Sequence, residues 1–307
     1  MSNSRHTKQE RARRALRRRL LGGLVISLCS ASVQAGAAER IVIAGGDLTE
    51  IVFALGEGQR VVGVDTTATY PAEAVDLPNI GYVRALSPEG VLSLRPESVL
   101  VSHFAGPETS LLRLNDAGVR VFRAPAPEGN AHSDVAAKIR FVGEVLDREA
   151  AATNLIEIFH AELDSTIREV ESLHPTSGWP PRTLFVLSAE SGPLVVGGKG
   201  TVAEQMIALA GGEPVTGNVQ GYRPLAMESV MALAPDVIVM MEEQLASIPH
   251  ERVLLRSDLA ATPAGRHGRL IAMDGMLLLG FGPRTPEAIR ELNRSLHRAM
   301  AKGMEPN

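Results

Sequence analysis

Short runs of β-branched and aliphatic residues alternate along the chain with stretches in which apolar side chains recur every three or four positions. This pattern predicts strands, each followed by an amphipathic helix. The first pair is residues 40–46 (RIVIAGG) and 47–55, which ends at Gly56. Further strands are expected at residues 61–65, 98–102, 119–123, 183–187 and 269–273. Strands that alternate with helices at this spacing predict an α/β fold with mostly parallel sheets covered on both faces.

Several segments carry local signals for helix ends and turns. Ser87 is expected to cap a helix, with Pro88 at its first position and Glu89 in its first turn. Ser133 is expected to cap another helix, which runs to about Leu146. The glycine-rich stretch 192–200 is interpreted as a turn between a strand and a helix.

Residues 148–173 predict one long helix, because Leu155, Phe159, Leu163 and Val170 fall along one stripe. A helix of this length spans about 39 Å. It is long enough to connect two lobes rigidly.

The two halves of the chain resemble each other. LTEIVFALG (48–56) matches VAEQMIALA (202–210), and SPEGVLSLRPESVLV (87–101) matches AMESVMALAPDVIVM (226–240). The sequence therefore predicts two Rossmann-like lobes joined by the long helix, with a ligand cleft between them. The expected boundaries are an N-terminal lobe at 38–147, a bridging helix at 148–174 and a C-terminal lobe at 175–307.

Residues 1–37 have the three-part form of a cleavable export signal. Eight basic residues and one acidic residue are accompanied by an apolar run at 20–28, and the segment ends in small residues at 35–37. The single cysteine, Cys29, lies inside this segment. The mature chain is expected in the periplasm without any thiol for a disulfide or a metal site.

Composition and motifs disfavour several functions. Aromatic residues make up only 4% of the chain, which is unfavourable for stacking nucleic-acid bases. The glycine-rich segments lack the spacing of a dinucleotide or phosphate loop, and neither G-x-S-x-G nor HExxH occurs. These observations disfavour an enzyme, and we expect no nucleic-acid partner.

The stretch GYVRALSPEG (81–90) carries the strongest candidate chemistry. A tyrosine binds ferric iron as phenolate, and a guanidinium nearby favours the phenolate and binds carboxylates, so Tyr82 and Arg84 are candidates to hold an iron porphyrin. Ordinary surface packing is the alternative reading of this pair. Glu89 and its repeat counterpart Glu228 either dock on a symmetric basic partner or compensate helix dipoles.

The mature chain resembles the periplasmic substrate-binding proteins of ABC importers that have two lobes bridged by one long helix. Within that class it is similar to haem carriers in four segments: GYVRALSPEGVLSLRPESVL, GTVAEQMIALAGG, GYRPLAMESVMALAPDVI and LLLGFGPRTPEA. The resemblance implies that Tyr82 is the axial ligand of ferric haem and that Arg84 stabilises the phenolate or a propionate. It also implies that Glu89 and Glu228 dock on arginines of a permease dimer, which works with its ATPase subunits.

Other candidate residues for haem lie around the expected cleft. His103 follows a strand and is a candidate distal contact, with a capping or exposed role as the alternative. Tyr222 and Arg223 are candidates for the propionates from loops of the second lobe, whereas Arg284 is interpreted as a surface charge. Ala189 and Glu190 stand where some members of the class have a histidine, so one haem per monomeric chain is expected.

Two other functions remain open. A carrier of the same class for cobalamin or a ferric siderophore is the nearest alternative. An exported α/β enzyme that uses the cleft, or a haem-degrading or haem-sensing protein, comes from a different functional class, and the fold alone is weak support for either.

Overall fold

Residues 39–173, 179–190, 192–246 and 248–301 are described by the structure, which is a computed structural model. The expected export signal at 1–37, including Cys29, lies outside these residues. Residues 39–307 form one compact unit, and the following description concerns that unit alone. No helix in the described ranges is long and apolar enough to cross a membrane.

The N-terminal lobe is built on a four-stranded parallel sheet in the order β2-β1-β3-β4. The strands are β1 (Ile41–Ala44), β2 (Val61–Val64), β3 (Ser98–Val101) and β4 (Arg120–Arg123). Every residue of the central strands β1 and β3 is buried, as expected for a parallel sheet with both faces covered.

Alternate residues of β1 contact the two helical layers of this lobe. Ile41 and Ile43 join the core beneath α2 (Gly46–Ala54) and α6 (Ala131–Val145). Val42 and Ala44 join the separate core beneath α4 (Pro88–Ser93) and α5 (Glu108–Asp116). Shorter helices in this lobe are η1 (Gly58–Arg60) and α3 (Ala72–Val75). Successive side chains of β1 thus point to opposite faces of the sheet and contact different helical layers.

The N-terminal cap of α6 differs from the expectation. Asn130, and not Ser133, caps this helix, because the Asn130 side chain accepts hydrogen bonds from the backbone N–H of His132 (2.9 Å) and Ser133 (3.3 Å). Asparagine caps a helix as well as serine does, and Asn130 precedes Ser133 by three residues, so the helix begins earlier than expected.

The C-terminal lobe contains a mixed sheet in the order β10-β9-β5-β6-β8, with β7 beside β5. The pairs β10–β9, β9–β5 and β5–β7 are parallel, whereas the pairs β5–β6 and β6–β8 are antiparallel. The strands are β5 (Arg182–Ser188), β6 (Leu194–Gly197), β7 (Glu213–Pro214), β8 (Tyr222–Leu225), β9 (Val237–Met241) and β10 (Leu270–Met273). Two expectations were wrong: strand β6 lies within the expected turn at 192–200, and Tyr222 and Arg223 lie on a strand.

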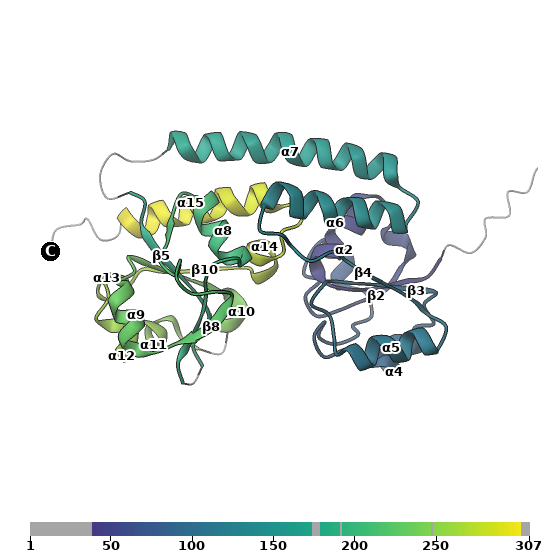
Figure 1. Ribbon diagram of the computed structural model, residues 1–307, viewed down its shortest axis with the longest axis horizontal. Helices are drawn as coiled ribbons and strands as arrows, with labels where there is room; N and C mark the ends of the chain where they lie inside the picture. The colour runs from purple at the N-terminus through teal and green to yellow at the C-terminus, as the bar shows by residue number, and fades with distance from the viewer. Residues whose placement is uncertain (1–38, 174–178, 191, 247, 302–307) are drawn as a thin grey trace, which may run out of the picture. The chain divides into compact units, whose positions relative to one another are not determined.

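Helices again cover both faces of this sheet (Figure 1). On the side of the long helix are α8 (Val202–Leu209), α14 (Gly275–Leu279) and α15 (Thr285–Ala301). On the other side are α9 (Met227–Leu233), α11 (His250–Leu254), α12 (Ser257–Ala260) and α13 (Pro263–Arg266), with α10 (Glu242–Leu245) after β9.

The predicted internal repeat is confirmed at the backbone level. Arg95 after α4 and Ala234 after α9 both adopt positive φ, at 50° and 42°, and each precedes a proline. In each lobe an arginine at the first strand then donates a hydrogen bond to a carbonyl at the end of the helix. Arg40, just before β1, donates to the Leu94 carbonyl (2.7 Å), and Arg182, the first residue of β5, donates to the Leu233 carbonyl (2.8 Å). The two lobes therefore share the same arrangement of strand and helix, including an arginine that binds the end of the helix.

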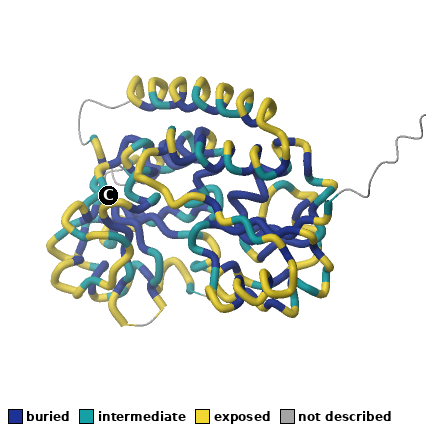
Figure 2. The backbone as a smooth tube through the Cα atoms, turned by 45° about the vertical axis from the view of Figure 1, so that its right-hand side comes forward, coloured by how far each residue is buried: buried dark blue, intermediate teal, exposed yellow. Residues whose placement is uncertain are grey.

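The long helix α7 (Glu149–Ser172) packs on α6 of the first lobe and on α15 of the second (Figure 1). Its buried residues face this layer, and its outer side is exposed (Figure 2). The contact is apolar, with Phe159 and Leu163 fully or almost fully buried.

A single hydrophobic core runs through both lobes on the side of α7. Buried residues from the first lobe, from α7 and from the second lobe belong to this one cluster; they include Ile43, Phe159, Leu163, Phe185 and Leu292. The opposite faces of the two sheets have separate cores. The lobes are thus joined along one side by packed apolar side chains, which resist deformation.

Candidate functional site

The loop that carries Tyr82 and Arg84 lies between α3 and α4, and Val83, the residue between these two, anchors it. The Val83 side chain is fully buried, whereas Tyr82 is 47% exposed and Arg84 is exposed as well. Neighbouring side chains in an extended or turning segment point in different directions, so burial of Val83 presents its two neighbours to the solvent. The tyrosine and the cation are therefore both exposed at the surface of the lobe.

Backbone hydrogen bonds fix this loop on both sides. The Gly81 carbonyl accepts from the Thr66 N–H after β2, and the Val83 carbonyl accepts from the Gly106 N–H after β3, both at 2.9 Å. Gly81 has φ of 90°, in the left-handed region that favours glycine. The loop is thus tied to the carboxyl ends of two strands, where ligands of α/β sheets bind.

The Arg84 guanidinium is itself held by an aromatic ring. Its central carbon lies 4.4 Å from the centroid of the Phe104 ring, within the range of a cation–π contact. Phe104 also contacts the neighbouring His103 edge to face, with ring centroids 4.9 Å apart. Phe104 was missed by sequence reasoning, because no local pattern connects a phenylalanine to an arginine twenty positions earlier.

His103 follows β3, as expected, and is half-buried beside this aromatic contact. Burial lowers the pKa of its imidazole, the Asp47 carboxylate opposes that effect, and the cations of Lys138, Arg84 and Arg123 add to it. A neutral imidazole is the form that ligates a metal.

We expect the imidazole of His103 to titrate below the usual value of about 6.5 because burial disfavours its charged form. Since the unfolded chain then binds the proton more tightly, the folding stability linked to His103 falls as the pH drops from about 6.5 through the lowered value. Proton NMR of the imidazole during a pH titration measures this. An apparent pKa at or above about 6.5 would contradict the expectation.

Tyr222 occupies the first position of β8, at the edge of the second sheet. Its ring packs edge-on against Phe185, with centroids 6.3 Å apart. Burial raises the pKa of Tyr222, although hydrogen bonds to the Ala203 backbone and the Thr201 side chain and the charge of Arg84 oppose this. The Tyr222 hydroxyl is thus engaged at the start of α8, and Arg84 of the other lobe acts on it electrostatically.

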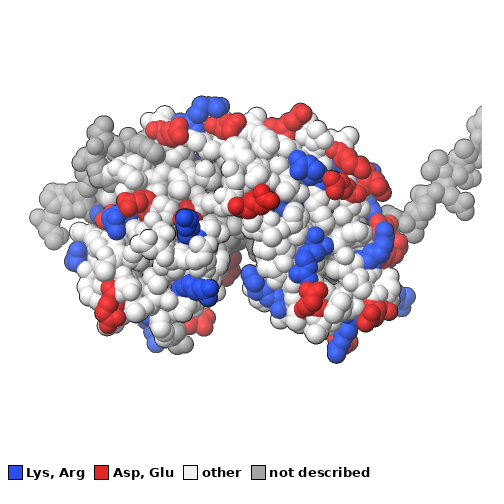
Figure 3. Space-filling model, in the orientation of Figure 1, with Lys and Arg blue, Asp and Glu red and all other residues white. Residues whose placement is uncertain are grey.

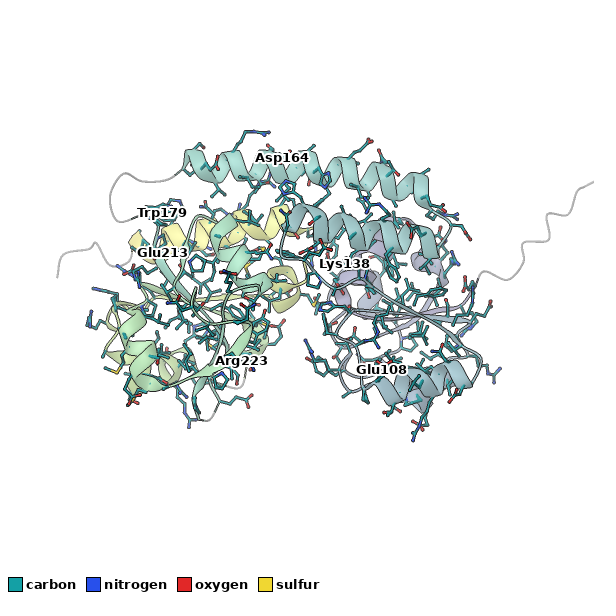
Figure 4. All side chains as sticks on the ribbon, viewed as in Figure 1. Glu108, Lys138, Asp164, Trp179, Glu213 and Arg223 are labelled. Carbon is teal, nitrogen blue, oxygen red and sulfur yellow. The ribbon has the colours of Figure 1, made fainter. Side chains whose placement is uncertain are left out.

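Arg223, the next residue of β8, is exposed and lies on the part of the second lobe nearest the first (Figure 4). In the space-filling view a notch separates the two lobes on the side away from α7, and lysine or arginine side chains lie on both sides of it (Figure 3). Two pockets of about 280 and 740 Å³ in the described residues do not include Tyr82. The electrostatic effect of Arg84 on Tyr222 of the other lobe indicates that the two residues face each other across this notch, which is therefore the candidate site.

The lobes are connected behind the notch by a buried lysine. The Lys138 ammonium on α6 donates to the Asp47 carboxylate (3.0 Å) in its own lobe and to the Gly280 carbonyl (2.7 Å) in the other. Lys138 lies where the two lobes meet (Figure 4). The Ser102 hydroxyl donates to the same carboxylate at 2.6 Å.

Arg284 forms a second connection between the lobes, so its interpretation as a surface charge was wrong. It pairs with the buried Glu50 on α2, and its guanidinium lies 3.9 Å from the ring centroid of Tyr70. Burial raises the pKa of Glu50, although Arg284 opposes this. Sequence reasoning missed the pair because its members are more than two hundred residues apart.

The two repeat-related glutamates are exposed in the first turns of α4 and α9. Both helices lie on the side of the unit away from α7 (Figure 1). Glu89 accepts a hydrogen bond from the Ser87 hydroxyl (2.9 Å), and the N–H of its own backbone and this hydroxyl lower its pKa. Glu228 has no capping side chain beside it, because Ala226 stands at that position. Two exposed carboxylates thus mark equivalent points of the two lobes.

No group of three or more His, Cys, Asp or Glu side chains able to hold a metal ion occurs among the residues that the structure describes. The candidate iron contacts are instead the single phenol of Tyr82 and the imidazole of His103.

Comparison with known proteins finds one family and several relatives. The family model described as periplasmic binding protein matches residues 41–277. Among solved structures, the periplasmic heme-binding protein BhuT in complex with two hemes is 40% identical, with a TM-score of 0.78; the match covers 85% of this chain and 99% of BhuT. The vitamin B12-binding protein of Yersinia pestis (strain Pestoides F) is 26% identical over 72% of this chain and 75% of its own length. An uncharacterized ABC transporter substrate-binding lipoprotein, YvrC of Bacillus subtilis (strain 168), is 26% identical over 81% of this chain and 77% of its own length.

Proposed function

The chain belongs to the periplasmic binding protein family of ABC importers, and from that premise we propose that its substrate is ferric haem, bound in the notch between the lobes. One arrangement carries this proposal: Tyr82 and Arg84 are both exposed, while Val83 between them is buried. The 40% identity to BhuT supports haem over other substrates of the family.

Each group near Tyr82 has a chemical role in this proposal. Tyr82 supplies the phenolate oxygen that ligates the ferric iron, and Arg84 pairs with that oxygen or with a propionate. His103, neutral at pH 7 because burial lowers its pKa, faces the iron or its water ligand as a distal contact. On the side of the second lobe, Arg223 pairs with a haem propionate. The ring of Tyr222 packs against the edge of the porphyrin, while its hydroxyl keeps its hydrogen bonds at the start of α8.

One haem per chain is the proposed stoichiometry. Ala189 at the end of the first strand of the second lobe is 5% exposed, and its carbonyl accepts a hydrogen bond from Arg256 (3.1 Å). Ala189 therefore offers no side chain that could ligate a second iron, and its exposed neighbour Glu190 offers a carboxylate where some members of the class have a histidine. Titration of the purified protein with haemin, followed by absorbance, should saturate at one equivalent, and saturation at two equivalents would refute this stoichiometry.

Cobalamin is the second candidate substrate, because the Yersinia relative that matches 72% of this chain is a vitamin B12-binding protein. A parallel titration with cyanocobalamin separates the candidates. Binding of haemin with a changed Soret band and no binding of cobalamin supports haem, and the reverse result supports cobalamin.

We further propose that Glu89 and Glu228 dock the loaded protein on a permease dimer with its ATPase subunits. Equivalent exposed carboxylates on two similar lobes fit a partner that presents the same basic pocket twice.

Replacing both Glu89 and Glu228 with arginine should reduce stimulation of the reconstituted transporter's ATPase by at least about tenfold, because like charges then meet at both points. The haemin affinity should stay unchanged, since both residues lie away from the notch. Glu157→Arg is the matched control, because Glu157 is equally exposed on α7, on the opposite side of the unit. Full stimulation by the double variant would overturn the docking assignment.

A further inference from the structure

The carboxylate of Asp65 lies beneath the site and has no role in the function proposed above. Asp65 follows β2 directly and is 1% exposed. Its oxygens accept hydrogen bonds from the backbone N–H of Gly45 (2.8 Å), Thr67 (3.2 Å) and Val83 (3.2 Å). The Thr67 hydroxyl also lies 2.9 and 3.0 Å from the two oxygens. One buried side chain thus collects donors from several segments of backbone.

These donors belong to three different loops. Gly45 lies between β1 and α2, Thr67 lies in the loop after β2, and Val83 lies between Tyr82 and Arg84. Burial raises the pKa of Asp65, and the hydrogen bonds from Thr67, Gly45 and Val83 oppose this rise. A buried carboxyl group that loses its hydrogen-bond donors is costly. Asp65 therefore fixes the backbone of the Tyr82 loop relative to the ends of β1 and β2.

The third backbone donor lies in the Tyr82 loop itself. Asp65 reaches eighteen residues along the chain to the N–H of Val83, the residue that separates the two candidate ligand residues. A shift of Val83 would displace the Tyr82 phenol and the Arg84 guanidinium together. Displacement of a ligating atom by about 1 Å is enough to lose most of its effect.

We propose that Asp65 is a positioning residue of the substrate site, which sets the orientation of Tyr82 and Arg84 through the Val83 N–H without itself touching the substrate. This inference rests on the proposed binding of haem by Tyr82, but its effect on the loop exists in the substrate-free protein and can be measured there.

Asp134 provides a matched control elsewhere in the same lobe. It is also buried, at 5% exposure, and its carboxylate accepts the backbone N–H of Glu128 (2.8 Å), Gly129 (3.1 Å) and Asn130 (3.0 Å). None of these donors belongs to the Tyr82 loop. Asp65→Asn and Asp134→Asn therefore remove the same charge from the same kind of loop anchor.

The first measurement is hydrogen exchange of the substrate-free protein, followed by mass spectrometry. Asp65→Asn should accelerate exchange in the peptide covering residues 79–87 by about tenfold or more, because the new amide turns an N–H toward backbone donors and releases Val83. Asp134→Asn should accelerate exchange only near 126–131. Unchanged exchange at 79–87 in a folded Asp65→Asn protein would overturn the inference whether or not the chain binds haem.

The second measurement is haemin titration with the absorption spectrum of the complex. Asp65→Asn should weaken the affinity at least about tenfold and shift the spectrum toward that of a Tyr82→Phe variant, whereas Asp134→Asn should keep the wild-type affinity and spectrum. An equal loss in both variants would show that general destabilisation causes it and would overturn the positioning role. If the wild-type protein binds no haemin, the proposed function fails, and the exchange measurement alone decides the role of Asp65.

Thr67→Val covers the case in which Asp65→Asn does not fold. Valine keeps the shape of threonine but removes the hydroxyl that contacts Asp65 and accepts the Gly46 N–H (2.9 Å). It should produce the same acceleration at 79–87 to a smaller extent. Exchange at the wild-type rate in this variant would then overturn the inference.

Discussion

Replacement of Tyr82 with phenylalanine should weaken haemin binding about a hundredfold or more, equivalent to roughly 2.7 kcal/mol, and remove the absorption bands of a tyrosinate–iron complex. The substitution deletes only the phenol oxygen, so the ring and the anchored backbone around buried Val83 remain. The remaining affinity would come from apolar contact with the porphyrin and from cations that pair with its propionates. Titration with haemin and the Soret spectrum of the complex measure both effects.

Tyr70→Phe is the control for this experiment. Tyr70 is 46% exposed, against 47% for Tyr82, and its ring lies beneath Arg284 and outside the Tyr82 loop. We expect wild-type affinity and spectrum from this variant. A Tyr82→Phe protein that keeps the wild-type spectrum would remove Tyr82 as the iron ligand, and equal losses in both variants would point to an effect on folding.

Replacement of Lys138 with methionine should reduce the free energy of unfolding by about 3 kcal/mol or more, because it leaves the Asp47 carboxylate buried without its charge partner. The side chains of Asp47 and Lys138 are only 6% and 11% exposed. Methionine fills a similar volume, so little of the loss should come from a cavity. Urea unfolding followed by circular dichroism measures the change.

Two further variants test the cause of this loss. Adding Asp47→Asn to Lys138→Met should restore part of the stability, because no buried charge is then left alone. Lys199→Met, at an exposed lysine, should change stability by no more than about 0.5 kcal/mol. If the double variant is less stable than Lys138→Met, the ion pair is not the origin of the effect.

The pH dependence of the same pair has a defined sign. Burial alone would raise the pKa of Asp47, but the charge of Lys138 and hydrogen bonds from Ser102 and Lys138 outweigh burial, and the pKa is lowered. The stability contributed by Asp47 is therefore present above the usual value of about 3.9 and is lost as the pH falls through the lowered value. Wild type should lose this contribution in that acid range, and the double variant should not.

Much of the fold could be predicted from local signals in the sequence. Glycines and prolines separate the strands and helices, Ser87 caps α4 as expected, and the repeat correctly paired α4 and β3 with α9 and β9. These signals act within a few residues of one another, so one sequence suffices to find them. The helix α7 was also predicted to within a residue, because its buried stripe is long and periodic.

Elements held by distant partners could not be predicted in this way. Strand β8 reads YRPL, with a proline and exposed residues, and it exists because its backbone pairs with β6. Its register aligns Leu225 with Leu194 across the pair, which no local pattern encodes.

The candidate site was predictable only in part, for the same reason. Tyr82 and Arg84 could be proposed from their type and spacing. The groups that hold them could not, because Asp65 and Phe104 are recognised only when the folded backbone brings them to the loop. Arg284 likewise looks like a surface cation until Glu50 is placed beside it.

The hydrophobic core shared by both lobes makes the two similar halves depend on each other. Each half contributes one side of a common apolar surface to its neighbour and to α7. A half expressed alone would expose that surface to water and would be prone to aggregate. Exchanging one half for its counterpart from a relative would therefore require the side chains along the shared core to be exchanged with it.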